Sequence, residues 1–203
     1  MCASYEARFN VRELVRAFIE AKIAAAADAP LPNWPDTDEV RPTDAGLAVR
    51  AGQGGAAELL TMRFGFPPPT PKRPPVINFR SEGRAFSNGP ASGRALIPVS
   101  GFYEFTGDKY PKTRWVLRAA DAPFLALAAL WRDGPDGAAF ALLTAEPGPD
   151  VAPFHDRGVL PVAPALWADW LSGAAPAADL LKPPPAGTLI AQQKPREKAG
   201  SLI

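Results

Sequence analysis

Residues 94–105 read RALIPVSGFYEF and form the longest of several apolar or alternating runs in this 203-residue chain. Similar runs occur at 46–51, 58–66, 113–119, 124–131 and 139–145. Short runs of this kind, bounded by Gly, Pro and Asp, are typical of β-strands. We therefore predict an α+β fold built on a mostly antiparallel, barrel-like β-sheet system with a few peripheral helices.

Two helices are predicted beside these strands. The sequence NVRELVRAFIEAKIAAAA at 10–27 places its apolar residues roughly on one face, and Asn10 can cap its start. A shorter helix is predicted at 164–173, between a Pro and a Gly. A last strand is expected at 188–191. We assign residues 1–190 to a single domain and residues 191–203 to a flexible C-terminal tail.

The composition argues against several kinds of protein. The formal net charge is +1, so no overall positive field points to nucleic acid, and any anion site must be local. The single Cys excludes an internal disulfide, and with a single His it argues against a Cys/His metal site. We expect no metal and no other cofactor. The sequence shows neither a secretory signal nor an apolar stretch long enough to span a membrane, so we expect a cytoplasmic protein.

Cys2 directly follows the initiator Met. Methionine aminopeptidases remove Met before small residues, so we expect a mature chain that starts with Cys2. An α-amine has a pKa of about 7.7–8.0 and is therefore partly neutral near pH 7. An amine and a thiol on adjacent carbons condense with an aldehyde, first to an imine and then to a five-membered thiazolidine. The alternative is that Cys2 is a small, partly buried residue without a chemical role.

Three other segments place polar residues among apolar ones. Burial of Glu104 between its aromatic neighbours would raise its pKa toward neutrality, whereas on the solvent face of an edge strand it would have no such role. His155 has an ordinary pKa suited to proton transfer at neutral pH, although a lone His is more often structural. In PVINFRSEGRAF, a strand would place Asn78, Arg80 and Glu82 on one side, toward a ligand or toward water.

Taken in order, these segments resemble the SRAP family, the SOS-response-associated peptidases that shield abasic sites in DNA. The family pattern starts with Met-Cys and continues with Asn-x-Arg-x-Glu, matched here by NFRSE at 78–82. A Gly-Phe-Tyr-Glu-aromatic segment follows, matched by GFYEF at 101–105. A Thr then precedes a His-containing element, matched by Thr144 and His155. Each piece alone is weak, but the ordered set over residues 2–162 is specific.

The resemblance implies a function and a role for each matched residue. Members of the family bind single-stranded DNA with an abasic site, and their N-terminal Cys captures the sugar aldehyde as a thiazolidine in the DNA damage response. By this similarity Cys2 is the nucleophile and Glu104 transfers protons at the sugar. His155 assists ring opening, and Asn78 holds the Cys2 backbone or the sugar. The implied DNA-binding group is Arg80 and Arg157 at phosphates, Glu82, and the stacking rings Phe64 and Phe105.

Two other interpretations remain open at this point. The first is a cysteine peptidase or amidohydrolase of the N-terminal-nucleophile type, in which Cys2 attacks an amide and its own α-amine serves as base. That activity could be limited to removal of Met1. The second is a noncatalytic single-strand-binding module, whose binding would survive Cys2→Ala without any covalent product. Strand cleavage by β-elimination could also accompany imine formation.

Overall fold

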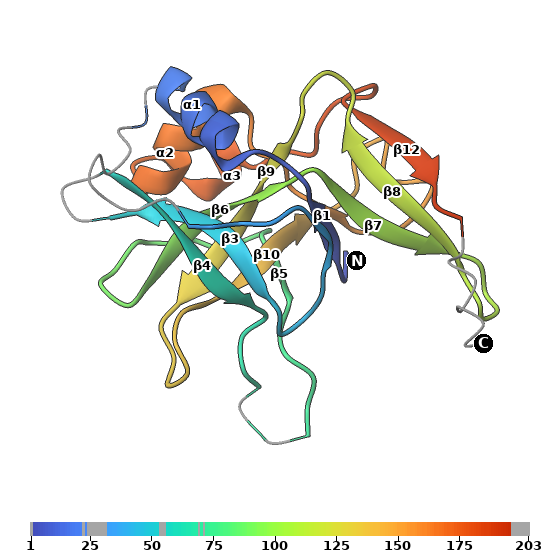
Figure 1. Cartoon of the computed structure of the whole chain (residues 1–203), viewed down its shortest axis with the longest axis horizontal. Coiled ribbons are helices and arrows are strands. Elements are labelled where there is room, and N and C mark those ends of the chain that lie inside the picture. Colours follow the sequence, from blue (N-terminus) through green and yellow to red (C-terminus); the bar gives the residue numbers. More distant parts are fainter. Residues whose placement is uncertain are drawn as a thin grey trace.

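The computed structural model describes residues 2–21, 23, 32–52, 56–68, 70 and 72–195, which fold into two β-sheets and a group of short helices (Figure 1). The larger sheet closes into a barrel, because β10 pairs with both β4 and β9 at the two ends of the ladder β10-β4-β3-β6-β9. Its strands are β3 (Ala45–Ala51), β4 (Ala57–Phe64), β5 (Asn78–Arg80), β6 (Ser92–Val99), β9 (Leu125–Arg132), β10 (Ala139–Ala145) and β11 (Gly158–Val159). Among these pairings, β10 is parallel to β4 and to β5, and the others are antiparallel. The predicted α+β, mostly antiparallel fold is confirmed.

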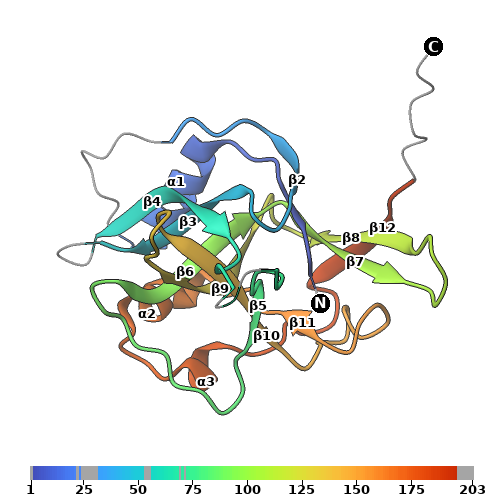
Figure 2. The ribbon, with the colours of Figure 1, turned by 90° about the horizontal axis from the view of Figure 1, so that it is seen from below.

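The smaller sheet extends to one side of the barrel (Figure 2). Its strand order is β12-β8-β7-β1-β2. The strands are β1 (Tyr5–Ala7), β2 (Thr37–Val40), β7 (Gly101–Thr106), β8 (Thr113–Ala119) and β12 (Leu189–Gln193). The short strand β1 thus lies inside this sheet, antiparallel to β2 on one side and to β7 on the other.

The run at 94–105 passes from one sheet to the other. It forms the end of β6 in the barrel and almost all of β7 in the smaller sheet, with Ser100 between them. At this crossing the Ser100 amide donates to the Glu6 carbonyl at 2.9 Å, and the Ser100 hydroxyl accepts from the Arg8 amide at 3.0 Å. The polar groups of a buried strand junction are therefore paired with the first strand of the chain.

Gly101 permits a close approach of β8 to the start of β7. A Cβ at this position would lie 2.9 Å from Val116 Cγ2, 2.9 Å from Arg118 Cγ and 3.0 Å from the Leu117 carbonyl oxygen. These distances are shorter than ordinary van der Waals contacts. The lack of a side chain at Gly101 is thus a packing requirement of the smaller sheet.

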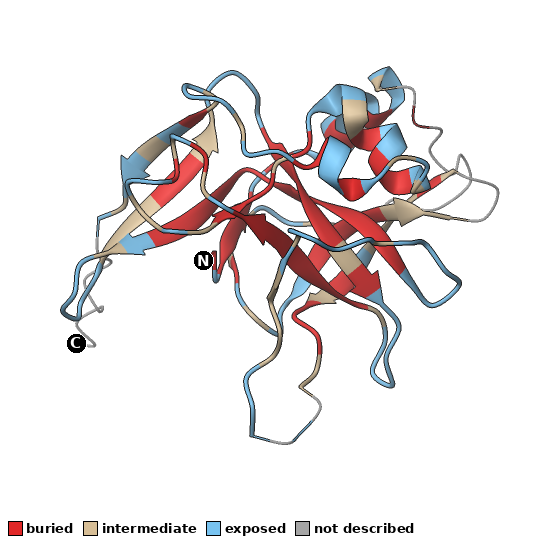
Figure 3. Cartoon of the chain, turned by 180° about the vertical axis from the view of Figure 1, so that it is seen from behind, coloured by how far each residue is buried: buried red, intermediate tan, exposed pale blue. Residues whose placement is uncertain are grey.

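The helices gather over one side of the barrel near β3 and β6, and buried residues run through both sheets and the inner faces of the helices (Figures 1 and 3). They are α1 (Val11–Glu20), α2 (Trp167–Ser172), α3 (Ala177–Leu180) and a 3₁₀ turn at Pro164–Leu166. Trp170 is fully buried, and its indole N–H donates to the Ala95 carbonyl at 2.9 Å. Phe18 packs on Trp167 with ring centroids 4.6 Å apart, which joins α1 to α2. Among the described residues no helix is long and apolar enough to cross a membrane.

The local predictions differ from the structure mainly at element ends. Helix α1 starts as predicted, with the Asn10 side chain accepting from the Arg12 amide at 2.8 Å, but it ends at Glu20. Residues 24–27 of the predicted helix lie outside the described residues. The strand expected at 188–191 is β12, which continues to Gln193, so the predicted domain boundary at 190 falls inside a strand. Of the tail, 196–203 lie outside the described residues.

Gly101→Ala should lower the free energy of unfolding by about 1–3 kcal/mol, because the added methyl group must displace β8. Urea denaturation followed by circular dichroism measures this change. Gly89→Ala is the matched control, because a Cβ there meets only the Ser92 carbonyl oxygen at 3.7 Å. Equal loss in both variants would contradict the packing role of Gly101.

Candidate functional site

Cys2 is held at the start of the smaller sheet and is fully buried. Its thiol donates to the Ser4 carbonyl at 3.2 Å, and the Asn78 side-chain amide donates to the Cys2 carbonyl at 3.1 Å. The Ser4 carbonyl also accepts from the Tyr103 amide at 3.1 Å, which ties this segment to β7. The residue that the sequence singles out is therefore fixed in position by β5 and β7.

The environment keeps the Cys2 thiol protonated. Burial raises the pKa of this thiol well above its ordinary value, and the negative charge of Glu104 raises it further. A thiol with a raised pKa is a poor nucleophile until a base accepts its proton. Cys2 therefore needs a proton acceptor beside it to react through sulfur.

Glu104 has the properties of that acceptor. It lies on β7, on the same side as Phe102, and both residues are essentially unexposed. Burial raises the pKa of the Glu104 carboxyl from 4.5 to about 7, and the charge of Asp156 contributes in the same direction. A group with this pKa can accept or donate a proton near neutral pH. The alternative of a solvent-facing Glu on an edge strand does not hold, because Glu104 is buried within a central strand.

His155 lies in the turn that follows β10, next to Asp156, whose charge acts on Glu104. Phe154 packs on Trp115 of β8 with ring centroids 5.0 Å apart, so this turn rests on the neighbour of β7. The His155 Nδ1 accepts from the Arg157 amide at 3.0 Å and lies 2.7 Å from Asp156 Oδ1. Burial lowers the pKa of His155, which favours the neutral ring. A neutral imidazole can accept a proton near neutral pH.

Asn78 links the barrel to Cys2. It starts β5, which pairs in parallel with β10 opposite Leu142. While its amide nitrogen donates to Cys2, its Oδ1 is buried and has no hydrogen-bond partner among the described residues. A buried acceptor without a partner carries a desolvation cost that a ligand hydroxyl or amine could relieve. Asn78 thus both holds the Cys2 backbone and offers a free acceptor.

Arg157 and Glu82 pair with each other. The Arg157 guanidinium binds both carboxylate oxygens of Glu82 and also donates to the Thr144 carbonyl at 2.8 Å. This pairing lowers the pKa of Glu82 to about 2 and raises that of Arg157. In this conformation the Arg157 guanidinium is bound to Glu82 and Thr144. Neither Arg157 nor Glu82 is therefore proposed as a phosphate contact.

The remaining predicted DNA contacts lie in different surroundings. Arg80 is exposed at the end of β5, opposite Thr144 of β10. Phe105 is 38% exposed. Phe64 is fully buried, with its ring stacked on Phe140 at 5.1 Å and against Tyr5 at 5.5 Å. Because the Phe64 ring has no free face, it cannot stack on a base in this conformation.

Ser4, Glu6 and Tyr103, whose roles the sequence did not predict, hold the first strand from the opposite side of the smaller sheet. Ser4 donates to Glu39 at 2.7 Å, and the Tyr103 hydroxyl donates to Glu6 at 2.7 Å. The one sequence signal for them is the alternation of Ser4 and Glu6 with the apolar Tyr5 and Ala7. Within the described part of the chain, no group of three or more His, Cys, Asp or Glu side chains could hold a metal ion.

The sequence matches the family model described as SOS response associated peptidase (SRAP) over residues 1–195. The chain belongs to the SRAP family. No curated protein matches the sequence significantly.

Several solved structures share the fold of this SRAP chain. A protein from Bordetella bronchiseptica is 24% identical with a TM-score of 0.71, covering 96% of this chain and 100% of its own. A phage-related protein from the same organism is 22% identical with a TM-score of 0.72, covering 98% and 97%. A protein from Bacteroides thetaiotaomicron is 13% identical with a TM-score of 0.66, covering 95% and 91%. At these identities the likeness concerns the fold alone.

The raised pKa of Glu104 predicts a dependence of stability on pH. Between about pH 4.5 and about pH 7 the folded protein retains a proton that the unfolded chain has released, so this group's contribution to stability falls as the pH rises through that window. Glu104→Gln stays neutral and should remove the fall. At about pH 8 the variant should therefore be more stable than the wild type by up to about 3 kcal/mol, and near pH 4.5 the two should be equal.

Urea denaturation at a series of pH values measures this difference. Glu58→Gln is the control, because Glu58 forms a partly exposed ion pair with Arg50 at 3.1 Å on the barrel. A Glu104→Gln variant with the same pH slope as the wild type would contradict the raised pKa.

Proposed function

We propose that this chain captures the aldehyde of an abasic site in single-stranded DNA, using the amine and thiol of Cys2 once Cys2 is the N-terminal residue. The observation that carries the proposal is that Glu104, whose pKa is about 7, lies close enough to the buried Cys2 thiol for its charge to raise the pKa of that thiol. Family membership alone supports an SOS-response-associated protein and leaves the chemistry open. The capture of an aldehyde is our inference from the site.

The reaction begins at the amine, because the thiol is protonated. The amine attacks the aldehyde carbon to give a carbinolamine, which loses one water and becomes an imine. The thiol then adds to the imine carbon, forming the carbon–sulfur bond and closing the ring. The thiol proton passes to Glu104 and from there to the ring nitrogen, so that one water is the only product released.

Asn78 and His155 assist these steps in the proposal. The donation of Asn78 to the Cys2 carbonyl keeps the terminal residue in one orientation, and its free Oδ1 can accept from the amine or from a sugar hydroxyl. Neutral His155 can act as a base and accept the proton of the anomeric hydroxyl as the deoxyribose opens to the aldehyde.

Binding of the DNA strand is expected to rest on local contacts. Arg80 is exposed at the end of the strand that carries Asn78, and it is the predicted phosphate contact that the structure leaves accessible. Phe105 offers part of its ring at the surface. Phosphate contacts make affinity salt-dependent even for a protein of net charge +1.

A peptidase activity, which the family description names, would use the same Cys2. In that alternative the thiol attacks an amide and needs to be a thiolate at neutral pH. The raised pKa of the thiol weighs against a resting thiolate and favours a route in which the amine reacts first.

Mixing the protein with single-stranded DNA that bears one abasic site should give a covalent adduct. Intact mass spectrometry should find the mass of the chain that starts at Cys2, plus DNA, minus one water. An abasic analogue that lacks the aldehyde is the matched control and should give no adduct. Absence of an adduct from protein that already starts at Cys2 would overturn the proposal and direct the search to amides and peptides.

Cys2→Ser distinguishes the carbon–nitrogen bond of the proposed product from its carbon–sulfur bond. Ser keeps the α-amine, so the imine should still form and should appear as an adduct only after reduction by borohydride. Without reduction the adduct should be lost on acid quench, because the thiazolidine cannot close. An equally stable adduct in Cys2→Ser without reduction would contradict closure by sulfur.

A further inference from the structure

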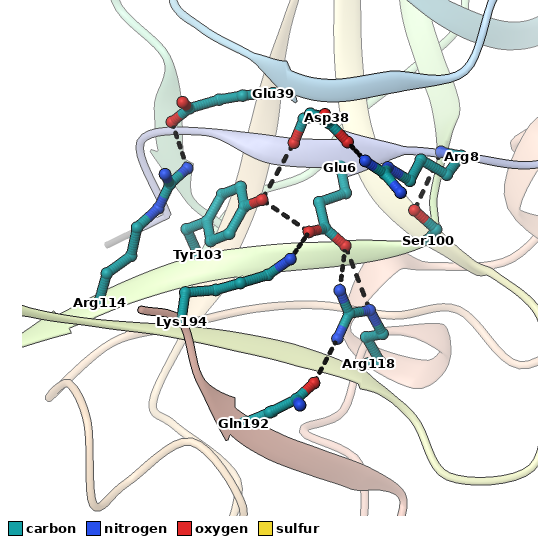
Figure 4. A network of polar contacts seen from close by, with 10 residues as sticks. All are labelled: Glu6, Arg8, Asp38, Glu39, Ser100, Tyr103, Arg114, Arg118, Gln192 and Lys194. Atoms are coloured by element: carbon teal, nitrogen blue, oxygen red, sulfur yellow. Dashed lines mark hydrogen bonds and ion pairs between the residues drawn. The ribbon is translucent and has the colours of Figure 1, made fainter. Parts of the chain in front are cut away.

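On β7, Tyr103 points to the opposite side of the smaller sheet from Glu104, and that side holds a connected set of polar side chains (Figure 4). At its centre is Glu6 of β1, whose side chain is only 2% exposed. Its carboxylate accepts from the Tyr103 hydroxyl at 2.7 Å, from Lys194 Nζ at 2.9 Å and from Arg118 Nη2 at 2.5 Å. We name these four residues, Glu6, Tyr103, Arg118 and Lys194, the Glu6 network.

The Glu6 network joins segments that are far apart in the sequence. Tyr103 comes from β7, Arg118 from β8, and Lys194 directly follows β12, near the last described residue. The Tyr103 hydroxyl also lies 3.0 Å from the Asp38 carbonyl oxygen of β2. Four of the five strands of the smaller sheet, or the residue next to them, are therefore tied to one buried carboxylate, and β2 lies beside the same Tyr103 hydroxyl.

A second tie starts two residues earlier. Ser4 donates to Glu39, which also forms an ion pair with Arg114 at 2.6 Å. The Arg114 guanidinium lies 3.6 Å from the centre of the Tyr103 ring, so this tie and the Glu6 network share Tyr103. Hydrogen bonds to ionised groups are stronger than those between neutral groups.

Such ties matter because the backbone alone holds this segment weakly. Strand β1 has three residues, and its pairing with β2 is irregular between Tyr5 and Ala7. Chain termini usually fray unless they are tied down. Cys2 lies only four positions before Glu6, so any release of β1 would move the thiol and the amine away from Glu104 and Asn78.

We propose that Glu6 is a positioning residue that fixes the N-terminal segment for the reaction of Cys2, and that Lys194 makes the segment after β12 part of the support of the site. The expected effect of the Glu6 network on aldehyde capture rests on the proposed function. The expected effect of the network on the accessibility of the Cys2 thiol is independent of that function.

The first test needs no DNA. Lys194→Met keeps the aliphatic stem and removes one donor to Glu6, while Tyr103 and Arg118 remain. We expect the rate of Cys2 alkylation by iodoacetamide to rise about threefold to tenfold, because local opening exposes the thiol. Glu6→Gln should raise it further. The amides of Ser100 and Tyr103, which donate to Glu6 and Ser4, should exchange hydrogen faster.

The second test separates positioning from binding. Lys194→Met should lower the rate constant of adduct formation at saturating abasic-site DNA, because a loosened β1 places the amine and the thiol less accurately beside Glu104, with little change in the affinity for the analogue that lacks the aldehyde. Glu58→Gln, which breaks an ion pair outside the network, should leave alkylation and capture unchanged. Equal alkylation rates in the wild type and in Lys194→Met would overturn the positioning role.

The two tests fail in different ways. If the wild type forms no adduct with abasic-site DNA, the proposed function fails, but the alkylation and exchange rates still decide the role of Glu6. If Glu6→Gln does not fold, Lys194→Met decides alone, because Lys194 lies at the sheet edge and its side chain is 34% exposed. Faster alkylation with an unchanged capture rate would show a structural tie and would overturn the positioning role.

Discussion

The site depends on the backbone hydrogen bonds that hold β1 inside the smaller sheet. The Tyr103 amide donates to the Ser4 carbonyl, and the Ser100 amide donates to the Glu6 carbonyl. These bonds come from the segment in which the chain leaves the barrel and enters the second sheet. Because Glu104 lies on that same segment, the pairing that builds the sheet also brings the buried carboxyl to Cys2. The parallel pairing of β5 with β10 adds Asn78 from the barrel side.

Two buried carboxylates on opposite sides of this sheet differ in protonation because of their neighbours. For Glu6, burial raises the pKa, but Tyr103, Lys194 and Arg118 together outweigh it, and the pKa is lowered. For Glu104, burial prevails, and the pKa rises to about 7. Glu6 therefore stays charged and holds its partners, whereas Glu104 can exchange a proton near neutral pH. The same residue type serves as a tie on one side and as a proton acceptor on the other.

The sequence predicts the barrel strands well, because these strands are buried and burial requires the apolar runs that are visible in the sequence. It does not show that residues 94–105 contribute to two sheets, since the partners of a strand are set by pairings far away in the chain. β2, with the sequence TDEV, has a single apolar residue, Val40, which is too little to predict a strand. Cys2, Asn78 and Glu104 were identified from ordered motifs and do meet in the structure. The burial of Phe64 and the pairing of Arg157 with Glu82 depend on which side each residue faces, which the motifs do not specify.

Under the proposed function, the protonated thiol makes the reaction selective and also determines that the amine reacts before the thiol. A thiolate reacts with many electrophiles, including disulfides and alkylating agents, whereas a buried thiol with a raised pKa reacts with few. If the amine reacts first, the thiol reacts only with a carbonyl compound, because the amine must first convert the carbonyl group to an imine. The imine carbon then lies within reach of the thiol. Glu104 then takes the proton at the step where sulfur bonds to carbon. Burial, which makes Cys2 a weak nucleophile by itself, thus restricts its chemistry to aldehydes that the amine has already bound.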